Sequence, residues 1–139
     1  MRLRVVGYKH YIISGGKHNV LQKNLKKDSA PKQLISRNAR KFWHDYLDYT
    51  DLKQAYAILI TDGGKVIAFF RYILHNARLT AIGTWVSPQH RRLGLGRRMW
   101  EHVLDRNKVK KIEVFTASKK GEELIKKITS LYPKIIWEI

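Results

Sequence analysis

The sequence contains no cysteine, so its 139 residues cannot form a disulfide, a thiolate metal site or a cysteine nucleophile. It also lacks an apolar run of about twenty residues, which a membrane-spanning helix requires. Residues 1–14 have no sustained apolar stretch, so we expect no signal peptide there. Together these absences predict a protein of the reducing cytoplasm without a membrane segment or a thiolate metal site, and we expect no other bound metal.

Acidic residues are scarce: 11 Asp and Glu stand against 28 Lys and Arg, which gives a formal net charge of +17. Such an excess predicts fast, salt-sensitive association with polyanions, although it does not specify a fold. A solvated basic surface without a partner is the alternative. Residues 90–111 are rich in Lys and Arg, but residues 17–27 and 31–47 are basic as well. Because one small ligand does not account for so wide a spread, nucleic acid or another polyanion is a candidate partner.

The apolar content of 44% is enough for a folded core, and the length suits one domain over residues 1–139. Hydrophobic periodicity predicts an α/β fold, a mixed sheet flanked by helices in the order β-α-α-β-β-β-α-β-α-β. The expected strands are 2–13, 55–61, 65–74, 78–86, 110–118 and 134–139, and the expected helices are 18–27, 31–47, one that begins near 95, and 121–132.

Local signals support several of these elements. Asp28-Ser29-Ala30-Pro31 is typical of a helix start. An apolar face is then expected from Leu34, Ile35, Ala39, Phe42, Trp43, Tyr46 and Leu47. Asp62-Gly63-Gly64 between two apolar runs predicts a hairpin, since its turn requires positive φ. Aromatic residues, among them Phe69, Phe70 and Tyr72, have spacings that favour core packing.

A glycine-rich loop follows the strand that ends near Val86, and it reads Arg-Arg-Leu-Gly-Leu-Gly over residues 91–96. An amphipathic helix follows, and its N-terminus exposes unpaired N–H groups and a partial positive charge that suit a phosphate. Glycine allows the backbone to approach the anion closely. The loop matches neither a Walker motif nor GxGxxG. A phosphate-bearing ligand and a plain structural turn therefore both remain open from the residues alone.

Val86-x-Pro88 followed by Arg91-x-x-Gly94-x-Gly96 resembles the R/Q-x-x-G-x-G/A acetyl-CoA signature of the GNAT superfamily of N-acetyltransferases, and the order of elements is similar to that fold. The resemblance implies that acetyl-CoA is the acyl donor. It implies that the diphosphate lies on Arg91, Arg92, Leu93, Gly94, Leu95, Gly96 and Arg97, and that the pantetheine arm pairs with Thr84, Trp85 and Val86. A side chain at Gly94 or Gly96 would then occupy the place of the diphosphate.

The sequence departs from the family pattern in two places. Family members often carry a tyrosine as general acid in the helix after the fifth strand, and counting from Ser118 puts that position at Ile125. The nearest tyrosine is Tyr132, which we keep as a candidate acid. The chain also has one strand after this helix where many members have two, so the sheet is completed by a partner chain, as in a homodimer, or simply ends there.

The catalytic base is equally open, because residues 63–100 contain no carboxylate. The candidates are His75, Glu113, His90 and Asp51, and each has a structural alternative: a loop, an exposed strand face, the basic rim and a helix cap, respectively. A backbone N–H near Val86 is expected to meet the oxyanion. Tyr49 and Tyr72 are candidates to line the acceptor site.

Two functions fit these residues. The first is an acetyl-CoA-dependent N-acetyltransferase that acts on an amine of a small molecule, a protein or a nucleic-acid carrier such as aminoacyl-tRNA. The second is a catalytically degenerate GNAT-fold module that binds nucleic acid or another polyanion. The absent tyrosine favours the second function, and the intact glycine loop favours the first.

Overall fold

A computed structural model describes residues 2–7, 11–12, 34–44, 55–114 and 119–138. These residues form the strands β1 (Arg2–Gly7), β2 (Tyr11–Ile12), β3 (Ala55–Asp62), β4 (Lys65–His75), β5 (Arg78–Val86), β6 (Lys111–Val114) and β7 (Ile136–Glu138). The helices are α1 (Arg37–His44), the short 3-10 helix η2 (Pro88–His90), α2 (Leu95–Arg106) and α3 (Lys119–Leu131). The predicted α/β architecture is confirmed.

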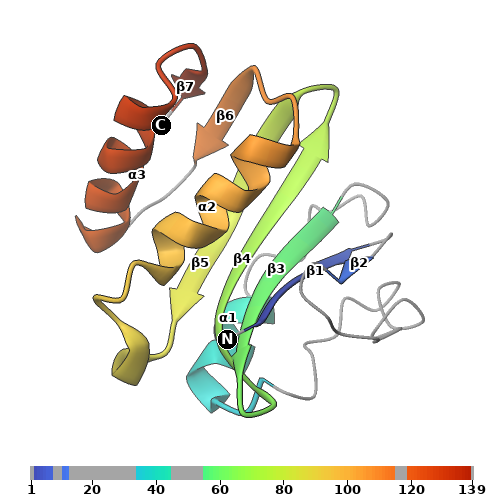
Figure 1. Ribbon diagram of the computed structural model, residues 1–139, viewed down its shortest axis with the longest axis vertical. Coiled ribbons are helices and arrows are strands. Elements are labelled where there is room, and N and C mark those ends of the chain that lie inside the picture. The colour runs from blue at the N-terminus through green and yellow to red at the C-terminus, as the bar shows by residue number, and fades with distance from the viewer. Residues whose placement is uncertain (1, 8–10, 13–33, 45–54, 115–118, 139) are drawn as a thin grey trace.

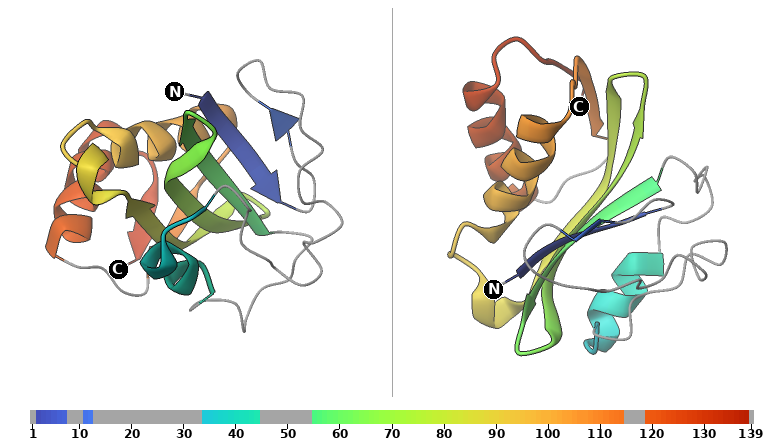
Figure 2. Two further views of the ribbon diagram at one scale, coloured as in Figure 1. Left: turned by 90° about the horizontal axis from the view of Figure 1, so that it is seen from below. Right: turned by 45° about the vertical axis from the view of Figure 1, so that its right-hand side comes forward.

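The strands form one sheet of seven in the order β2-β1-β3-β4-β5-β6-β7. Its first five strands pair antiparallel, whereas β5, β6 and β7 pair parallel, so the sheet is mixed as predicted. α2 and α3 cover one face of the sheet, and α1 lies on the other (Figures 1 and 2). β7 lies at the edge of the sheet, and a partner chain that pairs with it stays a prediction.

Two tight turns set the register of the central meander from β3 to β5. Gly63 and Gly64 join β3 to β4 with φ of 57° and 77°, which confirms the hairpin predicted from Asp-Gly-Gly. Asn76 and Ala77 join β4 to β5 with φ of 48° and 63°. Left-handed conformations at both central residues of a two-residue turn match the right-handed twist of the flanking strands.

The sheet separates two hydrophobic clusters. On the α2 face, Phe70 stacks on Trp100 with ring centroids 4.4 Å apart, and Trp100 in turn packs against Trp137 of β7. On the α1 face, Trp43 meets Phe69 edge-on at 5.0 Å. The aromatic spacing thus confirms the expected core packing. Tyr72, which was also a candidate to line the acceptor site, is buried in the α2-face cluster, so that alternative is wrong.

Several predicted boundaries are wrong. The single strand expected over 2–13 is two strands, because Val5 pairs with Tyr11 and Arg4 with Ile12 in an antiparallel hairpin. The helix expected from 31 begins only at Arg37, since the hydroxyl of Ser36 accepts the N–H of Ala39 at 3.3 Å and so caps the helix.

Ile35 precedes that helix and is 65% exposed, so it does not belong to the expected apolar face. The strands expected from 110 and 134 begin at Lys111 and Ile136, and the helix expected from 121 begins at Lys119. The predicted helix 18–27 and the candidates Tyr46, Leu47, Tyr49 and Asp51 lie outside the described residues.

Candidate functional site: the glycine loop and the second half of β5

The strand β5 is divided into two halves by its neighbours. Among the described residues, its parallel pairing with β6 begins at Arg78 opposite Lys111 and ends at Ala81 opposite Val114. At this point β5 also bulges, because Arg71 of β4 pairs with Gly83 and Tyr72 with Ala81, so that Ile82 is the extra residue. A bulge redirects a strand and interrupts its ladder. The half of β5 from Ile82 to Val86 therefore continues to the glycine loop without a described partner on its β6 side.

The glycine loop connects η2 to α2 through two left-handed residues. Arg92 has φ of 68° and Gly94 has φ of 74°. Gly94 is the N-cap of α2 and supplies no capping side chain, and the first turn of the helix contains no acidic residue. The first helical N–H groups have no carbonyl of a preceding turn to bond, so they stay available to an anion, which the helix dipole also favours.

The two glycines of the loop have different roles. A Cβ added at Gly94 would have no heavy atom within 4 Å, so this side of the backbone is open. A Cβ added at Gly96 would lie 3.0 Å from Cδ2 of Leu124 and 3.9 Å from Cγ2 of Thr84. Gly96 therefore permits the close approach of α2 to α3 and β5. The expectation that a side chain at Gly96 would occupy the diphosphate's place is wrong; the same expectation for Gly94 stays a prediction.

The other residues of the predicted loop site divide into anchors and exposed groups. Arg91 donates from Nε to the carbonyl of Val86 at 3.1 Å, which ties the loop to the end of β5. Leu95 is buried in the core, so only its backbone can face a ligand, whereas the side chain of Leu93 is 60% exposed. Arg97 is held by Glu101 at 2.6 Å, one helical turn further on.

The remaining two predicted residues flank this loop on β5. Trp85 stacks on Phe69 at 5.7 Å on the α1 face of the sheet. Thr84 approaches Gly96 at the start of α2. The structure thus brings the predicted cofactor residues together at one end of β5 and α2, and their role in binding stays a prediction.

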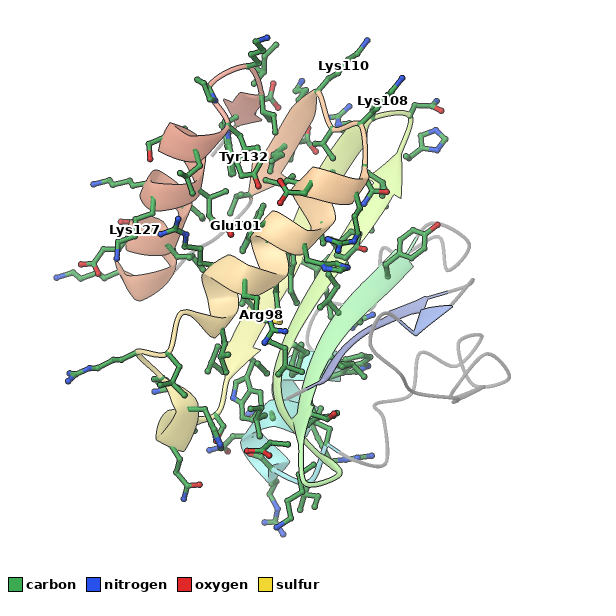
Figure 3. All side chains as sticks on the ribbon, in the orientation of Figure 1. Arg98, Glu101, Lys108, Lys110, Lys127 and Tyr132 are labelled. Atoms are coloured by element: carbon green, nitrogen blue, oxygen red, sulfur yellow. The ribbon has the colours of Figure 1, made fainter. Side chains whose placement is uncertain are left out.

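Tyr132, the candidate acid, follows α3 and lies between α3 and α2 (Figure 3). Its hydroxyl donates to Oδ1 of Asp105 at 2.5 Å. Burial raises the pKa of Tyr132 above its usual value of 10, and the hydrogen bond to the Asp105 carboxylate raises it further. A phenol whose proton is held in this way is a poor proton donor near neutral pH. Ile125, the position that the family pattern indicates, is buried and apolar.

The three candidate bases within the described residues come from different elements. Glu113 lies on β6 and forms an ion pair with Arg78. Its side chain is only 16% exposed, so it does not simply face solvent. His75 is exposed beside the β4–β5 turn, where its Nε2 lies 3.1 Å from the side-chain amide of Asn76. His90 lies in η2, with Nε2 3.9 Å from Oδ2 of Asp62. Their roles as bases stay predictions.

Two buried basic residues, Arg71 and His102, were not predicted from the sequence. Arg71 is 4% exposed; its Nη1 donates to the carbonyl of Trp43 at 2.6 Å and its guanidinium lies 4.5 Å from the centroid of that ring. It fastens α1 to the sheet, and the lone arginine inside the apolar run of β4 was the available signal.

His102 of α2 is 9% exposed. Burial lowers its pKa most, and the nearby charges of Arg106 and Arg98 lower it further.

Comparison with solved structures places the fold among acetyltransferases. The ribosomal-protein-S18-alanine N-acetyltransferase of Escherichia coli is 25% identical, with 55% of this chain and 52% of that chain covered and a TM-score of 0.49. The match thus spans about half the length of that enzyme. The aminoglycoside acetyltransferase meta-AAC0020 from an uncultured soil metagenomic sample, in complex with sisomicin, is 13% identical, with 99% and 91% covered and a TM-score of 0.55.

Sequence comparison identifies the family. No curated protein sequence matches the chain significantly. Among the described residues, no helix is long and apolar enough to cross a membrane. The model of the acetyltransferase (GNAT) family matches residues 23–123. That match covers most of the chain and confirms the resemblance seen in the glycine loop, so the protein belongs to the GNAT family of acetyltransferases.

Proposed function

We propose that the protein transfers the acetyl group of acetyl-CoA to an amine. The observation that carries this proposal is the glycine loop: Gly94 is left-handed, open on its outer side and placed at the uncapped start of α2. A diphosphate fits there because backbone N–H groups and the exposed arginines Arg92 and Arg98 supply positive charge without a blocking side chain. The family match supports the same donor.

The half of β5 from Ile82 to Val86 gives the second part of the donor site. Among the described residues it has no strand partner on its β6 side, so its backbone N–H and C=O groups there can pair with a ligand. An extended ligand with amide groups can add to such an edge as another strand would. The pantetheine arm of acetyl-CoA has this chemistry, and the edge leads from the glycine loop to the bulge at Ile82.

The reaction needs an amine nitrogen that has lost its proton. The nitrogen forms a bond to the acetyl carbon, the thioester C–S bond breaks, the surplus amine proton goes to solvent, and CoA leaves as a thiolate that takes up a proton. A thiol with a pKa near 8.5 leaves without a committed acid. Because the Tyr132 proton is held by Asp105, we expect water to supply that proton. Turnover should then rise with pH as the acceptor amine deprotonates.

The charge of the protein favours some acceptors over others. A net charge of +17 repels a polycationic small amine and attracts an amine carried on a polyanion. An amine on or near nucleic acid, such as the aminoacyl end of a charged tRNA, therefore fits the charge better than an aminoglycoside does. A peptide N-terminus on a nucleic-acid-binding protein is the second acceptor that fits.

Calorimetry with acetyl-CoA, followed by thiol release with three acceptors, tests this proposal. The acceptors are an aminoacyl-tRNA, a peptide with a free N-terminus and a polyamine. We expect saturable binding of acetyl-CoA and acceptor-dependent release of free CoA. Binding without thiol release from any acceptor would favour the catalytically degenerate module, and no binding at low salt would contradict the donor assignment itself.

A further inference from the structure

Three loops meet at the end of the molecule opposite the glycine loop. They are the β4–β5 turn, the α2–β6 connection and the α3–β7 connection. The N–H of Lys110 donates to the carbonyl of Ala77 at 2.8 Å, and the N–H of Ile136 donates to the carbonyl of Lys110 at 2.9 Å. These bonds join the loops into one surface, from which Lys108 and Lys110 project outward, far from Arg98 near the start of α2 (Figure 3).

Four exposed cations occupy this surface, and we call them the distal basic surface: Arg106, Lys108, Lys110 and Lys134. Lys108 and Lys110 flank Val109, which is half-buried and packs against the core on the α2 face. Anchoring of Val109 therefore directs both lysines to solvent. The surface is thus built by the fold, because it draws its cations from two separate loops and from the end of α2.

The carboxylates at this end already have partners. Asp105 accepts the hydroxyl of Tyr132, as described above. Glu113 pairs with Arg78, and Glu138 accepts Nζ of Lys111 at 2.6 Å. Among the described residues, no carboxylate lies within ion-pair distance of the four cations of the distal basic surface.

Acetyl-CoA on the glycine loop does not account for these cations. From Arg78 to Val86, β5 rises about 26 Å at about 3.3 Å per residue. The Debye length at physiological ionic strength is about 8 Å. Charges at the distal end are therefore screened from a diphosphate at the glycine loop. If these cations bind a ligand, it is not the diphosphate of acetyl-CoA.

We propose that the distal basic surface docks the phosphodiester backbone of a nucleic acid. Duplex nucleic acid carries one negative charge per about 1.7 Å of its axis, a density that suits a cluster of unpaired lysines and arginines. Such contacts position the backbone and do not distinguish sequence. The net charge of +17 supports the same partner. Docking at this surface does not depend on acetyl transfer and leaves the glycine loop accessible.

Two variants that each lose four positive charges distinguish binding at this surface from attraction by the overall charge of the protein. In one variant Arg106, Lys108, Lys110 and Lys134 are changed to Gln. In the matched control, four other exposed cations are changed to Gln: Lys65, Lys119, Lys126 and Lys127. Fluorescence anisotropy between about 50 and 200 mM salt measures affinity for a labelled 20-base-pair DNA, the same duplex in RNA, and a single-stranded RNA. The three probes show which form of nucleic acid the surface prefers.

The slope of log affinity against log salt concentration should become shallower by about three to four in the distal variant. This is about one for each phosphate that the surface no longer neutralises. The slope of the control should fall by no more than about one. Saturating acetyl-CoA should leave the affinity of the wild-type protein for nucleic acid within about twofold, because the two sites lie at opposite ends of β5. Binding of acetyl-CoA to the distal variant should equal that of the wild type, which separates this proposal from the donor assignment.

Three results would overturn the proposal. The first is an equal loss of affinity in the control, which would mean that the whole surface acts without a site. The second is competition by acetyl-CoA, which would place the nucleic acid at the glycine loop. The third is binding of polyglutamate as tight as that of the nucleic acids and lost in the distal variant. The partner would then be an acidic polypeptide.

Discussion

The two ends of α2 are both basic, but they are built differently. At its start, Gly94 is left-handed, no side chain caps the helix, and the N–H groups of the first turn have no carbonyl of a preceding turn to bond. At its end, the side-chain amide of Asn107 donates to the carbonyl of Val103 at 2.8 Å, and Lys108 and Lys110 project from a loop that is tied to its neighbours.

On our proposals, the two ends of α2 attract phosphate in different ways. The start of α2 offers fixed backbone donors, which depend on a single backbone conformation and on the absence of a Cβ. The end of α2 offers mobile side-chain charges, of which no single one is decisive and which weaken together as salt rises. One end should therefore respond to a single substitution, and the other to ionic strength.

The largest effect on folding is expected at Gly96, which separates packing from binding within the glycine loop. Gly96→Val should destabilise the fold by about 1–3 kcal/mol, because its Cβ would lie 3.0 Å from Cδ2 of Leu124 and its methyl groups need further room. Leu124→Ala should therefore cost less stability in the Gly96→Val chain than in the wild type, because it makes room for the valine. Urea unfolding measures both changes. If Gly96→Val removed acetyl-CoA binding while the fold kept its stability, Gly96 would belong to the binding surface after all.

A smaller effect is expected at the far end of α2, where Tyr132 meets Asp105. Tyr132→Phe removes the hydrogen bond between them and should cost about 1 kcal/mol of stability. Turnover should change by less than about tenfold, below the 10²–10⁴-fold range of a committed general acid. Unfolding and thiol-release assays on the same preparation give both numbers. A hundredfold loss of turnover with intact folding and acetyl-CoA affinity would make Tyr132 the acid.

The smallest effect is a pH trend at His102, midway along α2. Burial, followed by Arg106 and Arg98, lowers its pKa in the folded protein below the usual 6.5, while Asp105 opposes them. The unfolded chain therefore binds the proton more readily, and stability should decline as pH falls below about 6.5. His102→Leu removes this titration, so its stability relative to the wild type should improve toward acid pH. A difference that stays constant between pH 7.5 and 5.5 would contradict the assignment.

Local chemistry was enough to predict much of this fold. The central strands could be bounded from sequence because Asp62-Gly63-Gly64 allows the positive φ of a tight turn, and β5 was predicted with its observed bounds. The glycine loop was found for the same reason, since the glycines precede an amphipathic helix. The start of α1 was missed because Ser36, and not the stretch at 28–31, supplies its cap.

Contacts between distant residues could not be predicted in this way. The role of Gly96 depends on Leu124, which approaches from another helix, and Tyr132 is held by Asp105 across the same interface. The bulge at Ile82 arises from the register between β4 and β5, and the isolated Gly83 beside it in β5 was the available signal. These features decide which glycine is open to a ligand and whether a tyrosine is free to act as an acid.

The most direct test compares two glycines with nearly the same φ. Gly94 and Gly64 have φ of 74° and 77°, and an added Cβ would meet no heavy atom within 4 Å at either position. Gly94→Ala and Gly64→Ala should therefore lose similar stability, about 1 kcal/mol from left-handed strain. Calorimetry with acetyl-CoA should show binding weakened at least tenfold in Gly94→Ala and unchanged in Gly64→Ala. Equal affinity in the two variants would contradict the assignment of the diphosphate to the glycine loop.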